Sequence, residues 1–151
     1  MASLPVINEF VASNSSGLLD DNGHSSDWIE IFNAGSQAVS LAGYSLTDNA
    51  NDPTKYVLPN RLLGAGQYLV VFAADDADTT AGTDLYTGFG LSSGGEYLGF
   101  YDPSGNLLSG FSADGSDYPN QQTDVSYGLL DDGTPSSVSY THLTLPTTPY
   151  V

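Results

Sequence analysis

Two glutamates stand inside strongly apolar stretches of this sequence and could carry acid–base chemistry. Glu30 lies between Trp28 and Phe32, and Glu9 follows Ile7 by two residues. Since side chains repeat every second residue in a β-strand, we expect each glutamate on an apolar face of its strand. Such carboxylates could form the general acid and base of a hydrolase of the glycosidase type, because burial raises a carboxyl pKa. The alternative is structural: each accepts backbone or tyrosine hydrogen bonds, or pairs with a basic residue.

A second candidate site is the acidic segment 20–27, where oxygen-bearing side chains recur at short spacing. Asp20, Asn22 and Asp27 offer the hard oxygen ligands that suit Ca²⁺ rather than a transition metal. An EF-hand loop needs twelve residues and a closing bidentate Glu, and neither is present here. A solvated turn, in which Asp27 caps the start of the next strand, is the simpler interpretation. No cofactor other than possible Ca²⁺ is expected, and His24 alone makes no zinc site.

Nucleophilic catalysis finds little support in the remaining residues. The chain has no cysteine, no Gly-x-Ser-x-Gly elbow and no glycine-rich phosphate loop. We therefore predict that the chain is not an enzyme. Ten tyrosines could stack on sugar rings, although such aromatics more often belong to the core or to cross-strand pairs.

The elements that must position these residues are short strands separated by turns. Residues 27–33, Asp-Trp-Ile-Glu-Ile-Phe-Asn, are apolar on both faces of a strand, which predicts a central strand of a sheet. The composition and turn spacing predict seven or eight strands and hence an all-β sandwich. The expected strands are 6–12, 28–32, 44–46, 56–58, 68–73, 97–101, 107–111 and 125–129.

Turn chemistry and apolar alternation add detail to this sandwich. Asp102-Pro103-Ser104-Gly105 predicts a hairpin between strands 97–101 and 107–111. The acidic stretch 75–84 has no core residue and is expected to be a mobile insertion. The predicted core includes Trp28, Ile29, Ile31, Phe32, Leu46, Leu69, Val71 and Leu98.

Charge excludes several classes of partner. The chain of 151 residues carries 18 acidic and two basic residues, for a formal net charge of −16. Two basic residues cannot neutralise a phosphate backbone or an anionic membrane surface, so neither nucleic acid nor a membrane is an expected partner. No apolar run is long enough to span a membrane, and the first residues lack the pattern of a signal peptide.

The order of these segments resembles the lamin tail domain, an immunoglobulin-like sandwich. The resemblance runs from Val6 to about Gly133. Within this stretch, the chain departs from the bacterial pattern after the late glycine, since Leu129 stands where a basic residue is usual. The segments that carry the resemblance are 7–9, 27–33, 41–48, 66–73, 85–92, 94–98 and the late Ser-Tyr-Gly motif in 124–128.

The resemblance implies a non-catalytic interaction or adhesion module. Bacterial members resemble accessory domains of larger secreted or surface proteins, so the implied location is secreted or cell-surface and the implied partner is a protein or a cell-surface polymer. Two alternatives stay open. One is a calcium-dependent carbohydrate- or surface-binding module, and the other is a minor hydrolase that uses Glu9 and Glu30.

The C-terminal segment differs from the rest of the sequence. Residues 138–147, Val-Ser-Tyr-Thr-His-Leu-Thr-Leu-Pro-Thr, resemble a translated transposase-type sequencing adapter of the kind found in metagenomic assemblies. We therefore expect a domain at residues 1–137, truncated at its last strand, followed by a non-native tail at 138–151. A genuine threonine-rich linker is the alternative, and His142 would belong to this tail.

Overall fold

In the computed structural model, the described residues are 5–20, 23–74, 84–110, 118–129 and 135–138, and every regular element among them is a strand. The twelve strands are β1 (Pro5–Val11), β2 (Asp27–Asn33), β3 (Val39–Ser40), β4 (Ser45–Thr47), β5 (Tyr56–Val57), β6 (Leu62–Leu63), β7 (Tyr68–Ala73), β8 (Leu85–Tyr86), β9 (Gly99–Tyr101), β10 (Leu107–Gly110), β11 (Ser126–Leu129) and β12 (Pro135–Val138). No helix that could cross a membrane occurs in this part of the chain.

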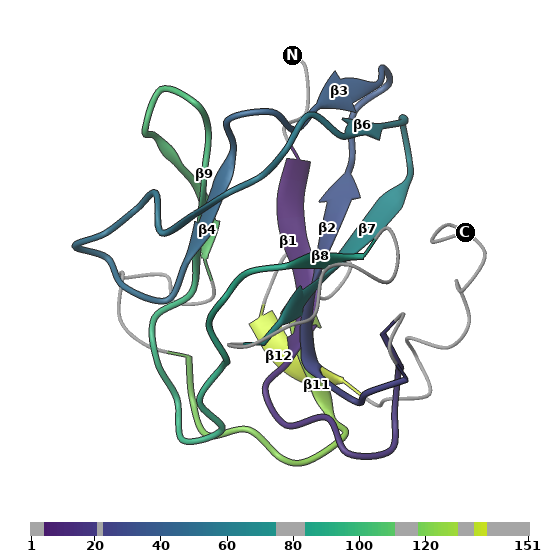
Figure 1. Cartoon of the computed structure of the whole chain (residues 1–151), viewed down its shortest axis with the longest axis vertical. Coiled ribbons are helices and arrows are strands. Elements are labelled where there is room, and N and C mark those ends of the chain that lie inside the picture. The colour runs from purple at the N-terminus through teal and green to yellow at the C-terminus, as the bar shows by residue number, and fades with distance from the viewer. Residues whose placement is uncertain (1–4, 21–22, 75–83, 111–117, 130–134, 139–151) are drawn as a thin grey trace.

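Two main sheets form the sandwich, and a small pair of strands extends one end. The larger sheet has the order β12-β11-β1-β2-β7-β8, and the smaller has the order β10-β9-β4-β5. Strands β3 and β6 pair with each other. Figure 1 shows β1, β2 and β7 side by side, with β4 and β9 in a separate layer. This all-strand architecture confirms the predicted immunoglobulin-like β-sandwich.

Strand β2 occupies the centre of the larger sheet, as its two apolar faces predict. It pairs antiparallel with β1 on one side and with β7 on the other. Ile29 and Ile31 point into the space between the sheets, whereas Trp28 belongs to a separate cluster on the outer face. Burial on both faces is the reason that this run lacks simple polar–apolar alternation.

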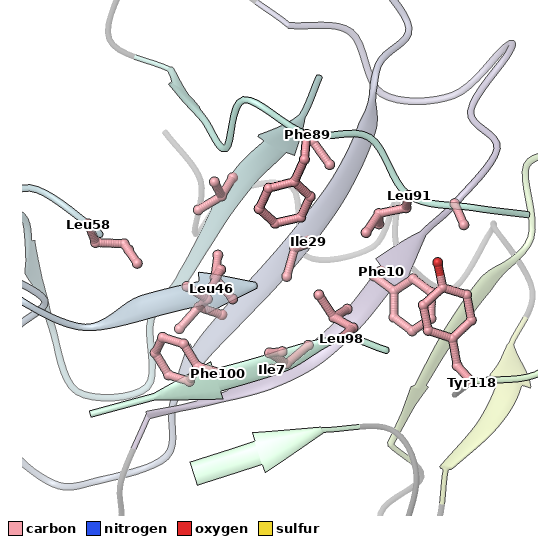
Figure 2. Packing of buried hydrophobic residues seen from close by; sticks show 14 of the residues in the cluster. Ile7, Phe10, Ile29, Leu46, Leu58, Phe89, Leu91, Leu98, Phe100 and Tyr118 are labelled. Carbon is pink, nitrogen blue, oxygen red and sulfur yellow. The ribbon is translucent and has the colours of Figure 1, made fainter. Parts of the chain in front are cut away.

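The main core lies between the two sheets. Figure 2 shows Ile29 near Leu46 of the opposite sheet, with Phe10 beside Tyr118; Phe100 belongs to the same cluster. The rings of Phe10 and Tyr118 have centroids 4.6 Å apart. Six of the eight predicted core residues are buried: Trp28, Ile29, Ile31, Leu46, Val71 and Leu98. Phe32 and Leu69 are only partly buried.

A smaller cluster covers the outer face of the larger sheet. Its buried members are Val11, Trp28, Phe72 and Tyr86, with Leu18, Val70 and Ala74 packed against them. Trp28 and Phe72 are register partners on neighbouring strands, as are Val11 and Trp28. The larger sheet therefore buries apolar surface on both of its faces.

The predicted hairpin is present, and several very short strands were not predicted. Strands β9 and β10 pair antiparallel, and Gly105 adopts a φ of 88° in the turn between them. Strands β3, β6 and β8 contain two residues each, which is too short for a period-2 pattern to be recognised. Strand β12 ends at Val138, the first residue of the expected tail, while 139–151 and the acidic stretch 75–83 lie outside the described residues.

Candidate functional site

Glu9 and Glu30 lie next to each other on the outer face of the larger sheet. They are direct register partners on β1 and β2. The exposed fraction is 3% for Glu9 and 1% for Glu30. The fold thus brings together the two carboxyl groups that the sequence singled out, and it closes both of them off from solvent.

A β-bulge at Asn8 determines which way Glu9 points. Ile7 pairs with Ile31 and Glu9 pairs with Glu30, so Asn8 is an extra residue in β1. The bulge changes the side-chain phase of the strand: Ile7 lies in the main core, and Glu9 faces outward. The expectation that Ile7 and Glu9 share a face is therefore wrong, because strict alternation fails at a bulge.

Each carboxylate accepts a hydrogen bond from a neighbouring polar side chain. Asn8 donates through Nδ2 to Oε1 of Glu30 at 2.7 Å. Ser126, on β11, donates through Oγ to Oε2 of Glu9 at 2.6 Å. Gly128 is the register partner of Glu9, and a Cβ at this glycine would clash with the Glu9 side chain and lie 2.6 Å from the backbone oxygen of Asn8.

The surroundings of the pair disfavour two negative charges. The pKa of Glu30 is raised to about 8: burial is the main cause, the hydrogen bond from Asn8 opposes it, and the charge of Glu9 adds a smaller increase. On β7, the ring of Tyr68 stacks on Phe32 with centroids 4.6 Å apart. The pKa of the Tyr68 phenol is raised by burial and by the two nearby glutamates. A proton is therefore retained at this site in conditions where an exposed glutamate would lose it.

This geometry does not provide a catalytic cleft. A hydrolase of the two-carboxylate type needs both groups in contact with a substrate and a water molecule. At exposures of 3% and 1%, Glu9 and Glu30 reach neither in this conformation. The pair can hold and release a proton, and it joins β11, β1 and β2 through side-chain contacts.

Asp20 and Asp27, two of the predicted calcium ligands, accept hydrogen bonds from neighbouring protein groups. Asp20 accepts hydrogen bonds from the backbone N–H of His24 at 3.0 Å and from Oγ of Ser26 at 3.2 Å. Asp27 accepts from the backbone N–H of Asn14 at 3.2 Å, and its pKa is raised by burial. Asn22 lies outside the described residues. Within the described ranges, no group of three or more acidic, His or Cys side chains is arranged to hold a metal ion.

The tyrosines form no solvent-facing row in the described part of the chain. Tyr86 and Tyr118 are buried, and the other six described tyrosines are partly buried: Tyr44, Tyr56, Tyr68, Tyr97, Tyr101 and Tyr127. Tyr97 packs over Gly99, and its hydroxyl lies 2.7 Å from the hydroxyl of Tyr101. These contacts agree with the structural interpretation of the aromatic residues rather than with a sugar-stacking platform.

Sequence reasoning missed three residues that complete the glutamate site. Asn8 was hidden by the unrecognised bulge. Ser126 and Gly128 belong to the late Ser-Tyr-Gly motif, which drew attention only as part of the family resemblance. The available signal was a serine and a glycine two positions apart, which places them on the same face of a strand. The serine hydroxyl can donate a hydrogen bond to a buried carboxylate, and the glycine leaves space for the glutamate side chain.

A second missed feature is the half-buried Asp124, which connects two loops through hydrogen bonds. Its carboxylate accepts hydrogen bonds from the backbone N–H groups of Ser15 at 2.7 Å and Ser16 at 3.1 Å, and from Oγ of both serines. These bonds, led by that from the Ser16 hydroxyl, lower the pKa of Asp124 to about 2. Asp124 also adopts a φ of 63°, which aspartate tolerates better than most residues. The contact closes the loop after β1 against the loop before β11.

Taken together, these features define an immunoglobulin-like domain with a buried glutamate pair and no assembled catalytic site among its described residues. Comparison with known protein families agrees with this class. The family model of the Lamin Tail Domain matches residues 3–115, well over half of the chain, so the chain belongs to the lamin tail domain family. No curated protein matches the chain.

Proposed function

We propose that this chain is a non-catalytic interaction module and an accessory domain of a larger secreted or cell-surface bacterial protein. The supporting observation is the family membership, combined with the burial of the two carboxyl groups that could have supported hydrolysis. Function then depends on a surface that binds a partner rather than on a reaction. The net charge of −16 disfavours nucleic acid as that partner.

The edge of the smaller sheet is the contact surface that we propose for this module. Segment 56–63 runs antiparallel to 39–46, through the β4–β5 and β3–β6 pairings and the bond from Leu58 N–H to the oxygen of Tyr44 at 2.7 Å. Strand β5 ends the sheet order, so its outer side has no strand neighbour among the described residues. Val57 and Leu62 are 49% and 69% exposed along this segment.

Such an edge suits an extended segment of a protein partner. Because Leu58 turns its N–H toward β4, the neighbouring Val57 turns its backbone groups outward. A partner strand could pair with these groups, which is the recognition mode known as strand addition. Pro59 has no N–H and shortens the edge available for such pairing, which also limits self-association.

The test uses two substitutions at one position. Val57→Pro removes the outward N–H without breaking a bond within the sheet, whereas Val57→Thr keeps the N–H and removes part of the apolar surface. Peptides that bind the purified chain are first selected from a random display library. We expect these peptides to bind the Val57→Thr variant and not to bind the Val57→Pro variant. Leu107→Thr is the matched control, because Leu107 is 51% exposed at the opposite edge of the same sheet.

Other outcomes would replace this proposal. Equal peptide binding by the Val57→Pro variant would exclude the β5 edge. Sedimentation of the chain with insoluble cell-wall polysaccharide in Ca²⁺ but not in a chelator would favour the carbohydrate-binding alternative. Hydrolysis of a generic substrate panel, abolished in a folded Glu30→Gln variant, would show that the chain is an enzyme.

A further inference from the structure

The two buried glutamates link three neighbouring strands at one position of the larger sheet. Glu9 on β1 pairs in register with Glu30 on β2 and with Gly128 on β11. Ser126 extends the contact from β11 by donating to Glu9 at 2.6 Å. Any change in the charge of this pair therefore acts directly on the junction between β11 and β1.

Few groups near the pair can balance two negative charges. From β7, Tyr68 contributes a phenol and Val70 is apolar. On β2, the residues two positions from Glu30 are the aromatic Trp28 and Phe32. Lys55 pairs with Asp48 at 2.7 Å, away from the glutamate pair. The uncharged Asn8 and Ser126 donate hydrogen bonds to Glu30 and Glu9, respectively.

Of the two strands that pair with β1, β11 is attached through fewer register pairs than β2. Strand β1 shares two register pairs with β11, whereas it shares six with β2, and β2 shares six with β7. Strand β11 in turn carries β12 through four pairs. Repulsion at the glutamate pair would therefore separate β11 and β12 from β1 before it disturbed the centre of the sheet.

We propose that Glu9 and Glu30 share one proton, and that this proton makes the attachment of the β11–β12 hairpin to β1 dependent on pH. With the proton in place, one carboxyl group is neutral and the pair is compatible with burial. When both groups are ionised, like charges face each other in register without water to screen them. The hairpin then loosens, while β1, β2 and β7 stay paired.

The direction of the pH dependence follows from which state holds more protons. Burial and the charge of Glu9 raise the pKa of Glu30 to about 8 in the folded chain, from an ordinary value of 4.5. The folded chain therefore binds more protons than the unfolded chain between these two values, so stability falls as pH rises through this window. The stabilisation from this proton is fully present below about pH 4.5. One excess proton changes the folding constant by at most about tenfold per pH unit.

The experiment measures urea unfolding of the full chain from pH 4.5 to 8.5 in about 0.3 M NaCl, which screens the general repulsion of a highly charged surface. We expect the folding constant of the native sequence to fall with pH and that of Glu30→Gln to lose most of this slope. Asp52→Asn is the matched control, because it removes one negative charge at an exposed position. If Glu30→Gln and Asp52→Asn give the same slope, the proposal is wrong.

Two measurements on the native sequence remain decisive even if a variant fails to fold. Carboxyl-carbon NMR should show that one of the two glutamates titrates above pH 6, and titration of both below pH 5.5 would refute the shared proton. Hydrogen exchange, corrected for the intrinsic rate, should rise more in 126–129 than in 27–33 between pH 5 and pH 8. An equal rise in both strands would refute the selective loosening of the hairpin.

Discussion

Replacement of Trp28 gives a direct test of the outer-face cluster. The ring is fully buried, with Val11, Phe72 and Tyr86 as its buried neighbours. Trp28→Ala would leave a cavity among these side chains, and large-to-small changes of this kind cost about 3 to 5 kcal/mol. We expect a loss in that range, because the neighbours sit on paired strands that cannot move inward to fill the space.

Trp28→Phe separates the packing of the ring from its polar atom. The indole Nε1–H of Trp28 is buried and has no hydrogen-bond partner among the described residues. An unpaired buried donor costs about 1 to 3 kcal/mol, and the smaller phenyl ring gives up a comparable amount of packing, about 1 to 2 kcal/mol. The two effects oppose each other, so we expect Trp28→Phe to lie within about 1 kcal/mol of the native chain.

The assay is urea unfolding followed by far-ultraviolet circular dichroism, because Trp28 is the only tryptophan and its fluorescence is lost in both variants. Thermal melts should agree, at roughly 4 °C per kcal/mol for a domain of this size. An unchanged midpoint for Trp28→Ala would mean that the ring is not packed as described. A Trp28→Phe variant as unstable as Trp28→Ala would mean that the N–H group is satisfied in solution.

Four further predictions concern stability. Gly128→Ala should cost about 1 to 3 kcal/mol in urea unfolding, because the added methyl meets Glu9 and the backbone of Asn8, and a neutral result would contradict the close approach of β11 and β1. The pKa of Asp124 is lowered to about 2, so its contribution to stability should be present above about pH 4 and lost as pH falls through 2. Asp124→Asn should therefore weaken the fall in melting temperature at acid pH. An unchanged profile of melting temperature against pH would contradict the loop contact. If segment 20–27 binds Ca²⁺, Ca²⁺ should raise the melting temperature more than matched NaCl or Mg²⁺, and at 100 times Kd the free energy of unfolding should rise by about 2.7 kcal/mol; equal shifts leave a solvated turn. Truncation after Val138 should leave the melting temperature unchanged, and a fall of many degrees would show that 139–151 belongs to the fold.

Much of the architecture could be predicted from local chemistry. The run 27–33 is apolar on both faces, and only a strand with neighbours on both sides and covers on both faces satisfies that pattern. The turn at Asp102 to Gly105 specified its hairpin because proline and glycine restrict the backbone locally. Such features depend on a few adjacent residues, so the sequence reveals them without knowledge of the rest of the chain.

The candidate site depended on relations that no local pattern contains. Alternation placed Ile7 and Glu9 on one face, but the bulge at Asn8 turned Glu9 outward, because β1 must satisfy pairing with β2 and packing in the main core at the same time. The sequence by itself determined that acidic residues stand in apolar strands. Strand order and register decided that Glu9 meets Glu30 and Ser126, since residues more than one hundred positions apart become neighbours only when β11 adds to β1.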